Sequence, residues 1–275
     1  MGIIVGVDVG GSTTKIVGFD GKKLLSPDFV KANDPVASLF GGFGKFTTDN
    51  KITLSDIDEV MVTGVGSAYI GNDIYGLPTT HVDEFRADGR GGLWLSGLKE
   101  AIVVSMGTGT ANVYANADTD EYTYLGGTGV GGGTLSGLAS LLLGMSDVRH
   151  VSELAESGDL SKIDLCISDI TERDLIPTLT NSATASNFGK LSDLASREDI
   201  ALGLINMVFE TVAMLAIFSA RMKKIRDIVL IGNLSVLPQA KPIFDNLSKM
   251  FNMNFIIPEN AGFGTVIGAA LENKR

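Results

Sequence analysis

The sequence is poor in cysteine and has no surplus of positive charge. Cys166 is the only cysteine among 275 residues, so neither a disulfide within the chain nor a cysteine-ligated cluster within one chain can form. Its apolar neighbours indicate a small buried residue. The 32 acidic residues exceed the 22 basic ones, giving a net charge of −10. That balance argues against a nucleic-acid or anionic-membrane surface, while leaving room for one local basic pocket.

Targeting and membrane-spanning signals are also missing. The N-terminus enters an apolar, strand-like run without a basic segment, so we expect no secretory signal peptide. No apolar run approaches the roughly 18 residues of a membrane span, and we therefore predict no membrane association. The expected location is the cytoplasm.

The pattern that is present is that of a two-domain α/β protein. Hydrophobic residues make up 44% and charged residues 20% of the chain, enough to bury a core, and the length suits two domains. The predicted elements run in the order ββ(β)αβαβα and then repeat it, which indicates duplicated halves with a cleft between them. The 34 glycines are clustered in the turns. We place one lobe at residues 1–98 and the other at 99–275.

The stretch from Gly6 to Lys15 is the first candidate site. Two apolar runs joined by a short Gly/Ser/Thr segment predict a β-hairpin. Its turn combines the groups that bind phosphate, because glycines expose backbone amides, hydroxyls donate hydrogen bonds and Lys15 neutralises charge. Asp8 is placed to hold Mg²⁺. The alternative is a tight hairpin in which Asp8 only caps the turn.

Two more glycine clusters follow in the second half. Gly107-Thr108-Gly109-Thr110 joins two strands and repeats the design of the first hairpin. Residues 126–134 then precede an apolar helix at 135–143, where free amides and the helix dipole suit an anion. The alternative for this third cluster is a flexible loop.

Expectations for the other segments are coarser. The glycines in 34–47 predict a poor helix, and residues 67–76 suggest a short one. We expect a charged, glycine-rich loop at 83–92 and a helical connection at 149–176. Residues 197–224 have a strong helical period with apolar residues on both faces, which indicates a core or subunit-interface helix.

Three motifs together resemble the actin, Hsp70 and sugar kinase superfamily: Asp-x-Gly-Gly-Ser-Thr at 8–13, Gly-Thr-Gly-Thr at 107–110, and strand-Gly-Asn before Ala261-Gly262-Phe263-Gly264. Within it the chain is similar to type II pantothenate kinases over essentially its whole length. The finer matches are residues 82–85, 105–110, 126–133 and Thr184-Ala185-Ser186-Asn187-Phe188-Gly189. The resemblance implies two duplicated RNase H-like α/β domains with an interdomain ATP cleft, the actin-like ATPase fold.

The resemblance also implies an ATP-dependent pantothenate kinase, a phosphotransferase with an alcohol acceptor that opens coenzyme A synthesis. Glu84 would be the general base, with Asp83 and, more weakly, Asp88 as competing acids, or it would be an ordinary solvated acid. The implied ATP and Mg²⁺ contacts are Asp8, Gly10, Gly11, Ser12, Thr13, Lys15, Thr108, Gly132, Gly133, Thr134, Leu135 and Ser136, with Gly232 and Asn233 near the base of ATP. The implied assembly is a homodimer through the long helix.

One position departs from the family pattern. An arginine commonly precedes the glycine-rich segment there, whereas this chain has Tyr124. Either Arg86 or Arg90 substitutes for it by clamping a carboxylate, or the substrate differs from pantothenate. The predicted acceptor contacts are Arg86, Thr110 and Tyr124.

Other functions stay open at this point. A kinase for another small alcohol, such as an amino sugar, would share the ATP site. An ATPase that activates a CoA dehydratase would need cysteines near a subunit interface, and the chain has only Cys166. A sugar-sensing repressor would need a helix-turn-helix ahead of Met1-Gly2-Ile3 and a less acidic surface.

Overall fold

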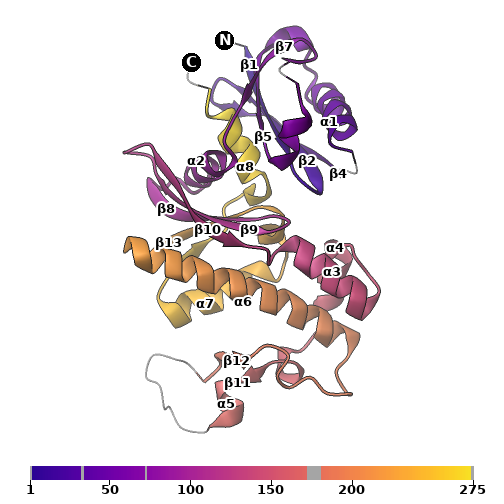
Figure 1. Cartoon of the computed structure of the whole chain (residues 1–275), viewed down its shortest axis with the longest axis vertical. Helices are drawn as coiled ribbons and strands as arrows, with labels where there is room; N and C mark the ends of the chain where they lie inside the picture. The colour runs from indigo at the N-terminus through magenta and orange to yellow at the C-terminus, as the bar shows by residue number, and fades with distance from the viewer. Residues whose placement is uncertain (1, 32–33, 72, 172–180, 274–275) are drawn as a thin grey trace.

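The computed structural model describes residues 2–31, 34–71, 73–171 and 181–273 (Figure 1). Two large sheets are separated by the helices α2 (Glu84–Ser96) and α8 (Gly264–Ala270). Helix α1 (Pro35–Asn50) covers the outer face of the first sheet, and α6 (Arg197–Lys223) with α7 (Ala240–Phe251) covers the outer face of the second. The chain therefore forms five layers, with both termini at the end of the first sheet.

The first sheet has seven strands in the order β3-β2-β1-β5-β7-β6, with β4 also paired to β2. β1 pairs antiparallel with β2 and parallel with β5, so the carboxyl ends of β1, β5 and β7 share one edge. The bounds are β1 Ile3–Val9, β2 Thr13–Asp20, β3 Lys23–Leu24, β4 Asp28–Lys31, β5 Ile57–Thr63, β6 Asp73–Ile74 and β7 Leu77–His81.

The second sheet repeats this plan with five strands in the order β10-β9-β8-β13-β14. Its first hairpin, β8–β9, is antiparallel, and β13 joins β8 in parallel. The bounds are β8 Glu100–Met106, β9 Thr110–Asn116, β10 Glu121–Thr128, β13 Asp227–Ile231 and β14 Asn254–Ile256. The prediction of two α/β halves that each begin with a hairpin is confirmed.

Helix α1 corrects the expectation of a poor helix at 34–47. Asp34 accepts a hydrogen bond from the Ala37 amide as N-cap, and Pro35 occupies the first turn. Each helical glycine costs about 1 kcal/mol relative to alanine. Burial of Phe43 and Phe46, worth about 1.5–3 kcal/mol for each side chain, offsets that cost.

Helix α2 replaces the loop predicted at 83–92. The Asp83 carboxylate caps it by accepting a hydrogen bond from the Arg86 amide at 2.8 Å. Its glycines allow close packing on both sides, because a Cβ on Gly92 would lie 2.6 Å from Val103 and one on Gly91 1.9 Å from the Gly264 carbonyl. The helix is therefore built to lie between two neighbours rather than to bend as a loop.

Two connecting segments also differ from expectation. Residues 67–76 begin inside a 3-10 turn at Val65–Tyr69 and include the short strand β6, where a helix was expected. The connection at 149–176 contains only short elements, and residues 172–176 lie outside the described part, as does Thr180. The remaining bounds are α3 Gly132–Leu143, α4 Val148–Ala155, β11 Leu165–Cys166, α5 Ile167–Ile170 and β12 Thr184–Ser186.

Helix α6 confirms the strong helical prediction for 197–224. Within the described residues it is the one helix whose length and hydropathy would suit a membrane crossing, with a mean hydropathy of 2.1 over its most apolar window. An apolar stretch of this length was not predicted from the sequence. In the structure 61% of that window is buried, against β8, β9 and α7 among others. Core packing therefore accounts for its apolar composition.

Helices α2 and α8 cross at backbone distance between the two sheets. A Cβ on Gly268 would lie 1.8 Å from the Ala87 carbonyl oxygen, so no side chain fits at the crossing. α8 packs on the first sheet through Val266 and Ala270, although it ends the chain. The lobe boundary between residues 98 and 99 stays a prediction. Helix α8 belongs by sequence to the predicted second lobe, but it packs against the first sheet.

Candidate active site

The two predicted phosphate turns face each other across the gap between the sheets. The Gly10 amide donates to the Thr13 carbonyl at 3.0 Å, and the Gly107 amide to the Gly109 carbonyl at 2.9 Å, so both turns are closed by the backbone. A Cβ built on Gly11 would lie 3.6 Å from Thr108 Oγ1. The fold therefore brings the two turns together, as a two-sided site requires.

The start of α3 lies against the second turn. The Gly132 and Gly133 amides donate to the carbonyls of Gly107 and Thr108 at 2.9 and 2.8 Å. These amides are not free for an anion, contrary to expectation, because the glycines let the two backbones approach closely. Leu135 is fully buried in the core, and its amide donates to the Gly131 carbonyl.

The remaining residues of this predicted segment are also engaged. Thr134 Oγ1 donates to the Gly129 carbonyl and Ser136 Oγ to the Ser146 carbonyl, at 2.8 and 2.7 Å. Gly133 is exposed and Thr134 partly exposed in the first turn of α3. The third glycine cluster thus runs from the end of β10 into the first turn of α3 and is hydrogen-bonded to the second turn, so it is not a flexible loop.

A carboxyl cluster lies next to these turns. Asp8 is near the end of β1, in register with Lys15 of β2 and Thr63 of β5. Burial raises the pKa of Asp8 to about 6, and the charge of Lys15 opposes that rise. Glu84 opens α2, and its pKa is raised by burial and then by the charges of Asp8 and Asp83. Glu84 is therefore close enough to Asp8 for their charges to interact, and it is a stronger base than a free carboxylate.

Asp88 belongs to the same cluster and was underestimated from the sequence. Only 1% of it is exposed, and burial raises its pKa to about 8. Thr265 Oγ1 of α8 donates to its Oδ1 at 2.6 Å, and this hydrogen bond partly opposes the rise in pKa. Its position four residues after Glu84, on the same helix face, is the signal that could have identified it.

Lys15 is buried rather than extended toward the gap. Its Nζ donates to the Gly262 carbonyl at 2.5 Å, and 8% of the residue is exposed. Burial lowers its pKa, while the charges of Asp8 and then Asp88 raise it. Lys15 therefore links the first hairpin to the segment that leads into α8.

The Gly232–Asn233 pair lies against both turns. Asn233 Nδ2 donates to Thr13 Oγ1 at 3.3 Å. Gly232 has φ of 93°, and a Cβ there would lie 2.6 Å from the Met106 carbonyl oxygen, so glycine is required. In the structure Asn233 contacts the first hairpin through Thr13, whereas the resemblance implied a position near the base of ATP.

Arg86 and Arg90 are ion-paired on α2. Arg86 Nε donates to Glu272 at 2.7 Å and its Nη2 to Asp120 at 2.8 Å, and Arg90 lies 3.2 Å from Glu272. The Arg86 guanidinium also lies 4.8 Å from the centre of the Tyr122 ring. The idea of free arginines on a loop beside Glu84 is wrong, because the segment is helical and Glu272 is buried against them.

Arg86→Ala should destabilise the protein, because it leaves buried Glu272 with only Arg90 and exposes the Tyr122 face. We expect a loss of about 1–2 kcal/mol, below the value for a fully buried pair because Arg86 is partly exposed. Thermal melting measures it, with Lys99→Ala in an exposed pair as the control. An unchanged melting midpoint with a raised KM for the phosphoryl acceptor would instead support the direct contact predicted from the sequence.

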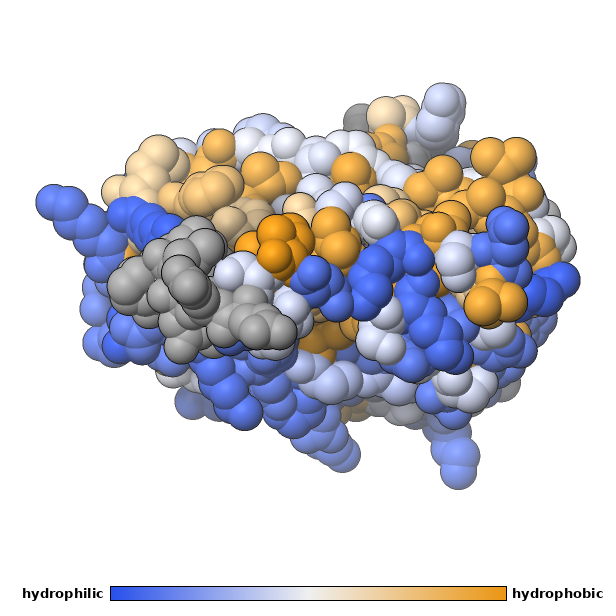
Figure 2. Space-filling view, turned by 90° about the horizontal axis from the view of Figure 1, so that it is seen from below, coloured by the Kyte–Doolittle hydropathy of each residue, from blue (hydrophilic) through white to orange (hydrophobic). Residues whose placement is uncertain are grey.

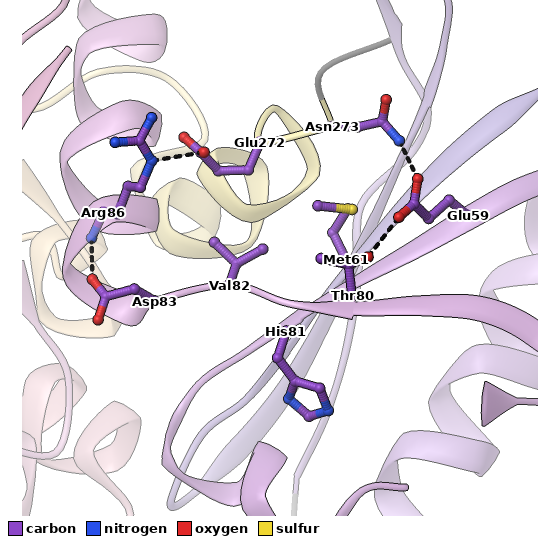
Figure 3. Close-up of a pocket in the computed structure, with 9 residues that line it drawn as sticks. All are labelled: Glu59, Met61, Thr80, His81, Val82, Asp83, Arg86, Glu272 and Asn273. Atoms are coloured by element: carbon purple, nitrogen blue, oxygen red, sulfur yellow. Dashed lines mark hydrogen bonds and ion pairs between the residues drawn. The ribbon is translucent and has the colours of Figure 1, made fainter. Parts of the chain in front are cut away.

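Of the other predicted acceptor contacts, Thr110 is buried and its Oγ1 donates to the Val130 carbonyl at 2.8 Å. Tyr124 is 47% exposed and stacks on Phe85. A separate pocket of about 550 Å³ lies over β5 and β7, where Arg86 points toward Glu272 (Figure 3). Of the residues named in the sequence analysis, Arg86 and the competing acid Asp83 line that pocket. Its full lining is Glu59, Met61, Thr80, His81, Val82, Asp83, Arg86, Glu272 and Asn273.

The donor set beside the turns fits Mg²⁺ held together with phosphate. Among the described residues no group of three His, Cys, Asp or Glu side chains forms a ready metal cage. Mg²⁺ usually takes one or two carboxylates together with substrate phosphates and water. Asp8 supplies such a carboxylate, and the buried Thr63 hydroxyl next to it on β5 has no hydrogen-bond partner in the structure.

Comparison with known proteins gives concordant results. Residues 99–254, more than half of the chain, match the protein family described as Fumble. A type II pantothenate kinase from Bacillus cereus is 30% identical over 286 residues, covering 97% of both chains. A type II pantothenate kinase from Oceanobacillus iheyensis is 30% identical over 232 residues, covering 80% of this chain and 84% of the relative.

Solved structures agree on the fold. The ADPNP-bound activator of the 2-hydroxyisocaproyl-CoA dehydratase from Clostridium difficile has a TM-score of 0.73 at 18% identity, covering 98% of this chain and 93% of that one. A ROK hexokinase from Thermus thermophilus gives 0.54 at 14% identity, covering 98% and 97%. The predicted actin-like ATPase fold is confirmed, and at these identities the likeness extends to the fold alone.

Proposed function

The chain belongs to the Fumble family of type II pantothenate kinases, and from this membership we propose that it transfers the γ-phosphoryl group of ATP to the 4′-hydroxyl of pantothenate. This reaction is the first step of coenzyme A biosynthesis. The protein is thus a kinase, a phosphotransferase with an alcohol as acceptor. The observation that carries the proposal beyond family membership is the charge interaction of Glu84 with Asp8, which lies on the strand leading into the first of the two facing Gly/Thr turns.

Glu84 is the proposed general base. It accepts the proton of the 4′-hydroxyl while that oxygen bonds to the γ-phosphorus and the bond from phosphorus to the β,γ-bridging oxygen breaks, releasing ADP. Its raised pKa suits this task, because burial and the neighbouring carboxylates make the protonated form easier to reach. The Asp83 cap fixes the first turn of α2, and therefore the place of Glu84.

The two turns are the proposed phosphate site. Gly10, Gly11, Ser12 and Thr13 would contact ATP from the first sheet, and Thr108 with the first turn of α3 (132–136) from the second. Given their hydrogen bonds, we assign Gly132, Gly133 and Leu135 the role of holding the start of α3 against the second turn, which leaves the partly exposed side chains of Thr134 and Ser136 as the proposed contacts. Gly232 and Asn233 then support the first hairpin through Thr13.

Asp8 is the proposed ligand of Mg²⁺, with Thr63 next to it on β5. Bound Mg²⁺ would neutralise part of the phosphate charge during transfer. The charge of Lys15 interacts with that of Asp8, and its ammonium group fixes the hairpin to the Gly262 carbonyl. Its proposed effect on the phosphates is therefore indirect, through Asp8. This role differs from that of a lysine whose side chain extends into the cleft, because Lys15 is buried.

An acceptor panel tests the proposed function against its main alternative. Purified protein with Mg-ATP is assayed for ADP release with pantothenate, glucosamine, N-acetylmannosamine and glucose. We expect pantothenate to stimulate release at least tenfold over ATP alone and the sugars to have no effect. Stimulation by an amino sugar without stimulation by pantothenate would establish the alternative kinase and overturn the proposal.

A cytoplasmic homodimer is the proposed state of the protein. Exposed apolar side chains occur on α3 and α6, including Leu141, Leu142, Phe218 and Met222, and hydrophobic residues are prominent on the face in Figure 2. Phe218 and Met222 lie one turn apart near the end of α6. Light scattering at micromolar concentration should give twice the mass of the chain, and Phe218→Glu should lower it. A monomeric wild-type protein would contradict the dimer.

A further inference from the structure

An aromatic pair stands beside the proposed base. The rings of Tyr124 on β10 and Phe85 on α2 are stacked, with centroids 4.1 Å apart and planes 17° from parallel. Phe85 directly follows Glu84. Tyr124 is 47% exposed, so part of this pair is available to a bound molecule.

The hydroxyl end of Tyr124 lies toward the second phosphate turn. A Cβ on Gly127 would be 2.9 Å from Tyr124 Oη and 2.3 Å from the Thr110 carbonyl oxygen. The pairing of β10 with β9 shifts register between Tyr124 and Gly126, which has φ of 130°. The bulge directly follows Tyr124, and only glycine at 127 leaves room for the hydroxyl end of this side chain. The Tyr124 side chain therefore extends from Phe85, the residue after Glu84, to the turn at Thr110.

The three cations of the proposed site are already engaged by other groups. The cations of α2, Arg86 and Arg90, are engaged by Glu272, and Arg86 also by Asp120. Lys15 of β2 is buried on Gly262. Glu84 directly precedes Phe85, and its charge interacts with those of Asp8 and Asp83. A carboxylate placed here would meet like charge, whereas an uncharged apolar group would gain contact with the rings.

We infer that the Tyr124–Phe85 pair forms the wall of the acceptor site for the non-reacting end of the substrate, and that this wall favours an uncharged end. This inference rests on the proposed function. It makes an amide of pantothenic acid the preferred acceptor and pantothenate itself a poorer substrate. The 4′-hydroxyl chemistry at Glu84 is the same for both. Discrimination comes from the tail, where the amide packs on the rings and the carboxylate is repelled.

The test compares kcat/KM for pantothenate and for its N-butyl amide. Wild-type protein should favour the amide at least tenfold. Tyr124→Phe retains the stack and should retain the preference, whereas Tyr124→Arg places a cation opposite the tail and should reverse it. Leu54→Arg, an added charge on an exposed turn of the first sheet, is the matched control and should change neither value.

The outcomes separate the two proposals. Phosphorylation of both compounds with pantothenate equal or better in the wild type would overturn the inference and leave the kinase function standing. Phosphorylation of neither would overturn the proposed function. An unchanged preference in a folded Tyr124→Arg protein would show that the wall lies elsewhere.

Discussion

Glu84→Gln should lower kcat for phosphoryl transfer by about 10²–10⁴-fold, the usual contribution of a positioned base. The amide has nearly the shape of the carboxylate but cannot accept the proton of the attacking hydroxyl. Because burial disfavours the charged form of Glu84, the neutral side chain should not destabilise the fold. ADP affinity should stay within about threefold, since binding depends on the turns.

Asp83→Asn is the matched control for this experiment. It makes the same chemical change one residue earlier, and asparagine caps a helix as well as aspartate does. We expect kcat within about threefold of wild type. Steady-state kinetics and ADP titration calorimetry on both variants provide the measurement. Equal loss of ADP binding and transfer in Glu84→Gln would assign Glu84 a structural role, and a collapse of kcat in Asp83→Asn would move the base to Asp83.

Gly268→Ala should be strongly destabilising, because the new methyl group would lie 1.8 Å from the Ala87 carbonyl and 2.6 Å from the Gly91 amide. Helices α2 and α8 would have to separate, which weakens their packing and shifts Asp88 from Thr265. We expect a loss of about 3–5 kcal/mol, at the upper end of single substitutions. Activity should fall as well, since α2 carries Glu84.

Gly41→Ala is the control, since the same substitution in α1 meets no atom within 4 Å. Alanine there should stabilise by about 0.5–1 kcal/mol through helix propensity. Denaturant unfolding of both variants gives the comparison. A Gly268→Ala protein as stable as Gly41→Ala would mean that the two helices do not cross as closely as the structure has them.

The sequence predicted the duplicated α/β plan because its signals are local. Strands ending in Gly/Thr turns occur at 3–19 and 101–114, and each hairpin formed where expected. Helix α6 was predictable for the same reason. Glycine gave the wrong prediction in α1 and α2, because its role there is to admit another element closely, as Gly91 does for Gly264. Nothing in the local sequence tells such a glycine from a helix breaker.

The site was predictable only in part. Asp8, Glu84 and Thr108 follow from motif positions, and the fold brings their segments together. The burial of Lys15, the pairing of Arg86 with Glu272 and the contact of Asp88 with Thr265 join residues far apart in sequence. Such contacts depend on how α8 returns to the first sheet, which no local pattern encodes.

The product of the reaction tests the proposed function most directly. Wild-type protein incubated with Mg-ATP and pantothenate should yield one phosphate monoester at the 4′-oxygen for each ADP released, as measured by ³¹P NMR and mass spectrometry. Glu84→Gln at the same concentration should yield less than one hundredth of that rate. ADP formed without phosphorylated pantothenate, or undiminished transfer by Glu84→Gln, would contradict a pantothenate kinase that uses Glu84 as its base.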